Sequence, residues 1–385
     1  MIYLDYNATT PLDKRILDKM LPYLRDSYGN PSSIYRFAQE SKRAIEDARL
    51  KVANLLSTDP LEVIFTSGGT ESNNAVIKGV AFYHQNKGKH IITSKIEHHA
   101  VLNTCEFLEK LGFEITYLGV DEYGLVDLEQ LKKAIKKETV LVSIMYANNE
   151  VGTIQSIKEI ADICRSRGVY FHTDAVQAVG KIKIDVNELG IDFLSLSAHK
   201  FYGPKGVGAL YARKGVKFYP LLHGGGHERN RRSGTENVAG IVGLGEAASL
   251  ALDEMQDEEK KIRLLRDRLE EGIKEKIPEV KVNGHPQNRL YNTLNVCIKH
   301  IEGESILINL DFEGICASSG SACTSGSLEP SHVLLAMGLP HEIAHGSLRF
   351  SLGKYTTGQD IENVLGVLPP IAEKLRKISP FWQGK

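Results

Sequence analysis

The sequence predicts an α/β protein whose larger part is a mainly parallel, doubly wound sheet with helices on both faces. Short apolar segments alternate with amphipathic helical segments from residue 38 to residue 200, and this alternation is typical of a parallel sheet. Polar side chains follow several apolar segments, as they do at the ligand-binding edge of such sheets. The segments expected to be strands are 63–66, 90–94, 113–120, 140–145, 169–174 and 191–197.

The composition is that of an ordinary globular protein. The 385 residues are enough for two domains and a large core, and 42% of them are apolar and 25% charged. A formal net charge of −1 gives no electrostatic reason to expect a nucleic acid or a membrane surface as partner. No apolar run approaches the length of a membrane span and the first residues do not resemble a signal peptide, so we expect a cytoplasmic protein.

The N-terminal part begins with polar, turn-forming clusters at residues 5–11 and 28–33, which alone specify little. A helix at 38–56 follows, with an apolar stripe that faces the core. After the strand at 63–66, a glycine turn leads into a helix at Thr70. The N–H groups at this helix start and the Thr70 hydroxyl would suit a phosphate, although a capped helix after a tight turn is an equally good interpretation. Neither a Walker loop nor GxGxxG is present.

Two strand ends in the middle of the chain carry side chains that suit pyridoxal phosphate. The apolar strand at 169–174 ends in Asp174, and Gln177 is expected one helical turn later on the same face. The strand at 191–197 leads to Lys200, beside a loop rich in Gly and Pro. A lysine can form a Schiff base with the cofactor's aldehyde, an acid can keep its pyridine nitrogen protonated, and Gln177 can donate to its phenolate. The alternatives are a solvated strand end for Lys200 and a salt bridge or helix cap for Asp174.

Histidines occur at two further places of interest. His98 and His99 begin a helix that runs to residue 111, and adjacent helical residues point to different faces, so they would not chelate one metal. One of them, near a cofactor, could stack on its ring or move protons, whereas a structural role is the alternative. His223 and His227 have the spacing of metal ligands, but the three glycines between them argue against a helix and hence against zinc.

The five cysteines are odd in number and form no CxxC pair, so we expect neither a disulfide framework nor a structural zinc site. Four of them, at 105, 164, 297 and 316, are expected to fill core. Cys323 lies instead in a loop of small residues, 318–327, with little apolar surface to bury. An exposed, reactive thiol is the better interpretation there.

A long charged helix from Leu252 to Ile277 is expected to connect to a smaller α+β domain. We place the large domain at 14–255 and the small domain at 1–13 and 256–385. Arg349 lies in the small domain, where it could clamp a substrate carboxylate or form an ordinary strand salt bridge. The expected strands there are near 280–283, 292–299 and 315–319, and the expected helices near 303–312, 331–337 and 358–377.

Together, these segments resemble the cysteine desulfurases, which are pyridoxal-phosphate enzymes of fold type I in the class V aminotransferase group. The matching motifs are collinear and span nearly the whole chain, which makes the resemblance specific. They are LDYNATTP (4–11), YGNPSS (28–33), TSGGTESNN (66–74), EHHAV (97–101), ANNEVG (147–152), HTDAVQAVGK (172–181), SAHKFYGPKGVG (197–208), HGGGHE (223–228), RSGTEN (232–237), SSGSACTSGSLEPSHVL (318–334) and SLRFSLG (347–353).

The resemblance implies a homodimer that converts L-cysteine to L-alanine and leaves a persulfide on Cys323. It implies that Lys200 carries the aldimine, Asp174 holds the pyridine nitrogen, Gln177 the phenolate, and His98 the ring face. The phosphate would be bound by Gly69, Thr70, Ser197 and His199, and by Thr235 of the partner subunit. The substrate carboxylate would be bound by Asn149, which also lies near the cofactor, and by Arg349.

The long SSGSACTSGS loop resembles the class of these enzymes that supplies iron–sulfur scaffolds. The resemblance therefore implies an iron–sulfur scaffold and other sulfur acceptors, such as tRNA-thiolation proteins, as partners. It implies no intrinsic metal, with Cys323 at most a transient ligand of a cluster on the scaffold. Close relatives extend well beyond a segment like Ser379–Trp382 and use that tail for docking, whereas only Gln383–Lys385 follow it here.

Three other functions agree less well with the residues. A selenocysteine lyase or another β-eliminating enzyme would share the cofactor, but those that need no thiol nucleophile leave the Cys323 loop without a purpose. A Rossmann-type oxidoreductase lacks its GxGxxG and acidic ribose partner here. A non-catalytic sulfur or metal carrier would leave Thr70, Asp174 and Lys200 unexplained.

Overall fold

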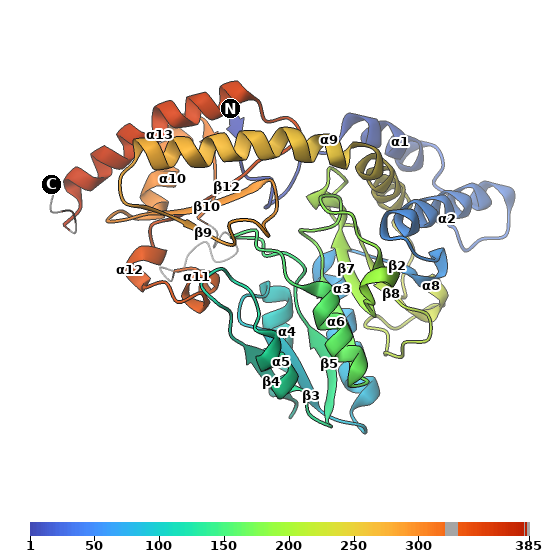
Figure 1. Cartoon of the computed structure of the whole chain (residues 1–385). Helices are drawn as coiled ribbons and strands as arrows, with labels where there is room; N and C mark the ends of the chain where they lie inside the picture. The colour runs from blue at the N-terminus through green and yellow to red at the C-terminus, as the bar shows by residue number, and fades with distance from the viewer. Residues whose placement is uncertain (320–329, 381, 383–385) are drawn as a thin grey trace.

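The computed structural model describes residues 1–319, 330–380 and 382 (Figure 1). Its larger sheet has seven strands in the order β2-β8-β7-β6-β5-β3-β4. Only β8 runs against the others, pairing antiparallel with both β2 and β7. The mainly parallel sheet predicted from the sequence is therefore confirmed. The strands are β2 (Val63–Thr66), β3 (His90–Ser94), β4 (Glu114–Leu118), β5 (Thr139–Ser143), β6 (Tyr170–Asp174), β7 (Phe193–Ser197) and β8 (Gly208–Ala212).

Helices cover both faces of this sheet. Successive residues of one strand belong to different apolar clusters, for example Ile91 and Ile92 on β3, or Leu141 and Val142 on β5. This is the alternation of side chains expected for a strand that is buried on both faces. The helices of this part are α1 (Lys14–Arg25), α2 (Arg36–Leu56), α3 (Gly69–His84), α4 (His99–Glu109), α5 (Leu128–Ala134), α6 (Ile157–Ser166), α7 (Val186–Leu189) and α8 (His227–Asn230), with short 3₁₀ turns η1 (Pro60–Glu62) and η2 (Ala198–Lys200).

The long helix α9 (Val238–Lys276) links the two parts of the molecule and begins well before the expected Leu252. Its first turns contain Gly240, Gly243 and Gly245, which lower helix propensity. Packing overrides that propensity, because a Cβ at Gly245 would lie 2.6 Å from the Cα of Ala48 on α2. Figure 1 shows α9 along the top of the molecule, with α1 and α2 near one end and α13 (Gly358–Ile378) beside the other.

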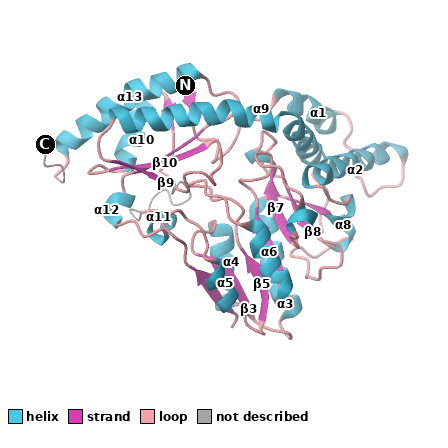
Figure 2. Ribbon diagram, viewed as in Figure 1, coloured by secondary structure: helices cyan, strands magenta, loops and turns pink. Residues whose placement is uncertain are grey.

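The smaller part is α+β, as predicted. Its sheet has the order β12-β10-β9, from Ser347–Ser351, Thr293–Ile298 and Val280–Asn283, and Figure 2 shows β9 and β10 beneath α9 and α13. The N-terminal strand β1 (Ile2–Tyr3) pairs with β11 (Ile315–Cys316), so that Leu4 joins the core of this part. The remaining helices are α10 (Gly303–Phe312), α11 (His332–Ala336) and α12 (His341–Ala344).

Several details differ from the expectation. β11 ends at Cys316 rather than at residue 319, and neither β8 nor α12 was expected as a separate element. The assignment of domains to 14–255 and to 1–13 with 256–385 stays a prediction. No helix within the described ranges is long and apolar enough to cross a membrane.

A buried ion pair anchors the segment around α8 to the sheet. Both nitrogens of the Arg49 fork donate to the Glu228 carboxylate, at 2.7 and 2.8 Å, and both side chains are 3% exposed. Arg49 also donates to the Val63 carbonyl, and Glu228 accepts from the N–H of Phe65, so the pair caps the edge of β2. Removing Arg49 would leave the Glu228 carboxylate buried without this ion pair, whereas Arg49 has a second ion pair with Glu46.

We therefore expect Arg49→Met to lower the free energy of unfolding by about 3–5 kcal/mol, measured by urea denaturation. The double variant Arg49→Met/Glu228→Gln should regain much of this, because the neutral amide can still accept from Phe65. As a control, Lys158→Met breaks the exposed Lys158–Asp162 pair and should change stability by at most about 0.5 kcal/mol. A loss no larger than the control's would contradict the assignment.

His172 is the buried polar link between three neighbouring strands. Its ring nitrogens contact the Ser143 hydroxyl on β5 at 2.8 Å and the Ser195 hydroxyl on β7 at 3.0 Å. Burial lowers the pKa of His172 to about 3, whereas an unfolded histidine titrates near pH 6.5. The unfolded chain therefore takes up this proton first as the pH falls. The stabilisation is complete above about pH 6.5 and is lost as the pH falls toward 3.

As the pH falls from 6.5 to 5, protonation of His172 in the unfolded chain should lower the free energy of unfolding. We expect this decrease to approach about 1.4 kcal/mol for each unit of pH. His172→Asn should show a correspondingly shallower pH dependence in urea denaturation. His223→Asn, which alters an exposed side chain, serves as the control and should keep the wild-type slope. Equal slopes in His172→Asn and the wild type would refute this assignment.

Candidate active site

Several of the predicted site residues lie at one edge of the large sheet, whereas Arg349 comes from β12 of the smaller sheet. Six of its strands share one direction, so their carboxyl ends meet there. Asp174 ends β6, Ser197 ends β7, and Lys200 closes the turn η2 that follows β7. This is the edge at which doubly wound sheets bind their ligands.

Asp174 is buried and held by two donors. Its carboxylate accepts a hydrogen bond from the side chain of Asn73 at 2.6 Å and another from the N–H of Val176 at 3.0 Å. Asn73 comes from α3, so one contact fixes the acid relative to the helix that begins at the glycine turn. The sequence analysis assigned no role to Asn73, although its motif was recognised. The Oδ1 atom of Asn73 has no partner among the described residues.

Gln177 lies in a turn, and the expectation that it follows Asp174 on a helix is wrong. Residues 176–181 form turns, and Gly180 has φ +78°. A Cβ at Gly180 would lie 2.5 Å from the Cβ of Phe201, so both the conformation and the space require glycine. The chain nevertheless delivers Gln177 to the site, where its Nε2 donates to the Asn7 carbonyl at 2.9 Å.

The N-terminal segment crosses the site. The Lys200 amine donates to the carbonyls of Asn7 and Ala8, at 2.7 Å each. The hydroxyl of Thr9 contacts the Nδ1 atom of His199 at 3.0 Å, and Thr10 donates to the His199 carbonyl. Sequence reasoning missed this function of residues 5–10. Its only signal was a polar cluster too rich in turn formers to be a simple linker.

His98 caps α4 and is held as a neutral ring. Its Nδ1 accepts from the N–H of Ala100 at 3.0 Å, which leaves the proton of the neutral ring on Nε2. Burial lowers the pKa of His98; the charge of Asp174 opposes this and that of Lys200 adds to it. The charges of Asp174 and Lys200 therefore both act on the His98 ring.

The proposed phosphate site lies at the start of α3. Gly68 has φ +151°, and a Cβ there would lie 3.7 Å from the Ser197 hydroxyl, so this turn faces the end of β7. Gly69 has no room for a side chain, because its Cβ would lie 2.5 Å from Val176. Thr70 is exposed and its hydroxyl is accessible at the helix N-terminus.

His199 and Thr235 were also predicted to bind the phosphate. Burial first, and then the charge of Lys200, lower the pKa of His199 to about 4, so its ring is neutral at pH 7. Thr235 is exposed and lines a cavity of about 160 Å³ with Ser67 and Gly206 of the same chain. Its predicted contact with a phosphate in a partner subunit stays a prediction.

Arg349 forms a salt bridge, one of the two roles expected for it, whereas its role as a clamp for a substrate carboxylate stays a prediction. It forms an ion pair with Asp5 at 2.7 Å, and its other terminal nitrogen donates to the Asn149 carbonyl at 3.0 Å. The side chain is buried, and its Nε has no partner among the described residues. These two contacts, one of them with the backbone of Asn149, use two of the five N–H groups of the guanidinium, so donors remain for a ligand carboxylate.

Cys323 lies outside the described residues, but both flanks of its loop are bonded to the site. The backbone of Ser318 pairs with that of Arg349 through two hydrogen bonds. On the other side, the Ser331 hydroxyl donates to the Glu150 carboxylate, and the His332 ring contacts the Glu97 carbonyl at 3.0 Å. The described residues on both sides of the Cys323 loop are therefore bonded to residues at or next to the predicted site.

Glu97 and Glu150, to which the residues after the Cys323 loop are bonded, are two buried acids. Burial raises the pKa of Glu97 to about 8, although the Ser94 hydroxyl and the Met145 N–H both donate to it. Burial also raises the pKa of Glu150 to about 7, opposed by Ser331 and by the charge of Arg349. Buried acids with pKa values near neutrality are frequent at functional sites.

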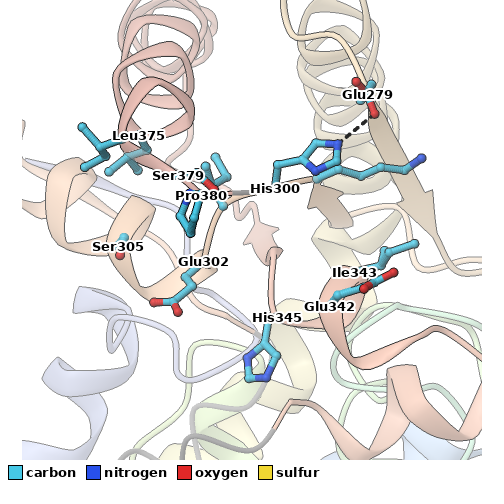
Figure 3. A pocket seen from close by; sticks show the side chains of 13 residues that line it. Glu279, His300, Glu302, Ser305, Glu342, Ile343, His345, Leu375, Ser379 and Pro380 are labelled. Carbon is cyan, nitrogen blue, oxygen red and sulfur yellow. Dashed lines mark hydrogen bonds and ion pairs between the residues drawn. The ribbon is translucent and has the colours of Figure 1, made fainter. Parts of the chain in front are cut away.

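The other four cysteines are free, and three are buried as expected, whereas Cys316 is half-buried. Among the residues with described positions, no group of three His, Cys, Asp or Glu side chains is arranged to hold a metal. A separate cavity of about 790 Å³ lies between α10, α12 and α13, and Figure 3 shows Glu302 and His345 beside it and Glu279 bonded to His300 at 3.1 Å. None of the predicted site residues lines it.

Comparison with known proteins agrees with this arrangement. The family model of class-V aminotransferases matches residues 2–364. A cysteine desulfurase IscS of Dictyoglomus turgidum is 58% identical over 99% of this chain and 97% of its own length, and one of Methanosarcina thermophila is 59% identical over 99% and 94%. The solved structure of a NifS-like protein covers 98% of this chain and 100% of its own, with a TM-score of 0.91 and 41% identity.

The family model covers most of the chain. The relatives share more than half of their residues with it along nearly their whole length, and both findings agree with the layout of the sheet edge. This chain belongs to the class-V aminotransferases and, within them, to the cysteine desulfurases.

Proposed function

We propose that this chain removes the sulfur of L-cysteine, releases L-alanine and holds the sulfur on Cys323 as a persulfide. The observation that carries this proposal is the bonding of both flanks of the Cys323 loop to the site, through Ser318 on Arg349 and through His332 on Glu97. We therefore infer that the Cys323 thiol acts near Arg349, which would bind the substrate carboxylate, and near Lys200, which would bind the cofactor.

The residues present fit pyridoxal phosphate. The helix start at Gly69 and Thr70, with Ser197 and His199 opposite, offers donors for a phosphate, and Thr235 of the partner subunit would complete them in a homodimer. The buried carboxylate of Asp174, fixed by Asn73, suits a protonated ring nitrogen. Lys200 would bind the aldehyde carbon, and His98 would cover the ring. When bound, the cofactor supplies an electron sink for the substrate's Cα.

The substrate carboxylate would bind to Arg349 and Asn149. The Nε of Arg349, which is buried and has no acceptor in the described chain, would donate to this carboxylate. The bond from Nη2 to Asp5 holds the guanidinium in place before the substrate arrives. Such fixed donors reduce the loss of side-chain entropy on binding.

The reaction needs no external oxidant. Lys200, beside the bound substrate, would take the proton from Cα and later return it to Cα. The Cys323 thiolate would attack the substrate sulfur; the Cβ–S bond breaks, an S–S bond forms, and Cβ keeps the electron pair and gains the proton that the Cys323 thiol lost. L-cysteine and the enzyme thiol thus become L-alanine and an enzyme persulfide, with all atoms accounted for.

The persulfide would then pass to acceptor proteins. The IscS name of the similar proteins and the long cysteine loop support an iron–sulfur scaffold as acceptor, with other sulfur-accepting proteins as further partners. A transient contact of Cys323 with a cluster on the scaffold belongs to the same proposal. The cytoplasmic location expected from the sequence stays a prediction.

Lys200→Ala should abolish the covalent bond between protein and cofactor without unfolding the chain, because Lys200 is only partly buried at a strand end. Borohydride reduction followed by mass spectrometry should find labelled wild-type protein and unlabelled variant. Lys205→Ala, at an exposed lysine of the same loop, should remain labelled. A label that persists in Lys200→Ala would place the attachment elsewhere.

Cys323→Ser should still bind the cofactor and change its absorption when L-cysteine is added, because Lys200, Asp174 and the phosphate donors are intact. It should release neither alanine nor sulfide, and mass spectrometry should find no persulfide on it. Cys316→Ser, at a half-buried cysteine, should behave as the wild type. Normal alanine release by Cys323→Ser would favour simple elimination over attack by a thiol.

A further inference from the structure

Lys181 is a buried lysine beside the proposed cofactor site, and nothing in the reaction above uses it. Lys181 is only 7% exposed. Its amine donates to the backbone carbonyl and to the side-chain Oε1 of Gln177, both at 3.1 Å. No carboxylate in the described chain forms an ion pair with it. A lysine buried without a carboxylate is unfavourable for folding, so it is an unusual residue to find there without a task.

The charged groups that face Lys181 come from three elements. Lys200 and Arg349 lower its pKa and Glu258 of α9 raises it, but burial is the largest cause, and the pKa of Lys181 falls to about 7. Glu258 is itself engaged by the Tyr202 hydroxyl at 2.6 Å. The amine keeps hydrogens to donate in either protonation state, so its contact with the amide of Gln177 does not depend on its charge.

The contact determines how the Gln177 amide points. A lysine amine that faces Oε1 can only donate to it, so the amide nitrogen must lie on the opposite side. There Nε2 donates to the Asn7 carbonyl at 2.9 Å, the same atom that accepts from Lys200. The amide is therefore held at both ends, and its second N–H has no acceptor among the described residues.

The turn that brings Lys181 back to Gln177 is built for this contact. Gly180 adopts a left-handed conformation against Phe201, and the N–H of Lys181 donates to the Ala178 carbonyl at 3.0 Å. A helix would direct the two side chains along its surface, where a lysine amine is normally solvated. The turn instead buries the amine against the amide.

We propose that Lys181 is a positioning residue for the reaction, which holds Gln177 so that the remaining N–H of its amide is presented to the phenolate oxygen of the bound cofactor. This inference rests on the proposed function, since it assigns the ligand of that N–H. It predicts that Lys181 acts through Gln177 and not by its own charge.

Lys181→Met tests this, because methionine keeps much of the chain length but cannot donate. A donor to the ring oxygen favours the anionic form of that oxygen, so its loss should raise the apparent pKa read from a pH titration of the bound cofactor's visible absorption, by about one unit or tenfold in proton affinity. Lys181→Gln, which introduces a neutral donor, should bring the apparent pKa part of the way back to the wild-type value. Lys183→Met, which alters an exposed lysine two residues away, should leave the titration unchanged.

A double-variant cycle separates positioning from charge. In a Gln177→Ala background, the further change Lys181→Met should shift the titration by much less than it does when Gln177 is present. A shift of equal size in both backgrounds would show a direct effect of the Lys181 charge and overturn the proposal, as would an unchanged titration in Lys181→Met.

The outcome for the cofactor itself distinguishes this proposal from the proposed function. If the unsubstituted protein binds no pyridoxal phosphate, the proposed function fails and the inference with it. If the wild type binds the cofactor through Lys200 but the Lys181 variants titrate like the wild type, only the inference fails. The midpoint temperature of thermal unfolding of Lys181→Met should be no lower than that of the wild type. The substitution removes a buried amine that forms no ion pair within the described chain. Should Lys181→Met nevertheless fail to fold, the Lys181→Gln comparison with and without Gln177 decides the same question.

Discussion

The carbonyl of Asn7 is the contact on which the arrangement of the site depends. It accepts from the amine of Lys200 and from the amide of Gln177, and thereby joins the ends of two neighbouring strands through a third piece of chain. Asn7 is almost fully buried, and its own side chain donates to Thr293 in the smaller part and to the Asn149 carbonyl in the larger one. One residue therefore links the two parts where the proposed chemistry takes place. A backbone carbonyl suits this position because it cannot titrate and its direction is fixed by the chain.

The electrostatics of the site follow from the burial of its charged groups. Burial moves the pKa values of Glu97, Glu150 and Lys181 to about 8, 7 and 7, toward neutrality from opposite sides. Burial likewise keeps His98 and His199 neutral. The Asp5–Arg349 ion pair is a contrasting case, since each partner compensates the other's charge. A ligand with a phosphate and a carboxylate group would bind to donors that buried protein groups hold in place, rather than to mobile water molecules.

The sequence was informative where side-chain pattern determines structure. The alternation of apolar segments identified six of the seven strands of the large sheet, and the chemistry at their ends identified Asp174 and Lys200. It missed β8, because the reversed direction of a short strand leaves no trace in its periodicity. It placed the start of α9 too late, because Gly243 and Gly245 lower helix propensity, while their close packing on other helices is a tertiary property.

The parts of the site that were missed share a physical reason. Residues 5–10 act largely through backbone atoms and small polar side chains, which no residue pattern marks as partners of Lys200 and His199. Lys181 carries no sign in the sequence that it is buried, and Asn73 resembles any polar residue in the first turns of a helix. Gln177 was assigned its role while its local structure was wrong, because Gly180 turns the chain where helical spacing would have continued.

The confinement of Cys323 follows from the covalent chain alone. Ser319, whose carbonyl accepts from the Ser347 hydroxyl at 3.0 Å, adjoins the residue that pairs with Arg349. Cys323 is four residues further along the chain, and four residues span at most about 14 Å when fully extended. The Cα of Cys323 therefore stays within that distance of Ser319 in every conformation of the loop. Any acceptor of the persulfide must therefore reach the neighbourhood of β12, the strand from which Arg349 would bind the substrate. A short covalent tether of this kind keeps the effective concentration of a thiol near its target high.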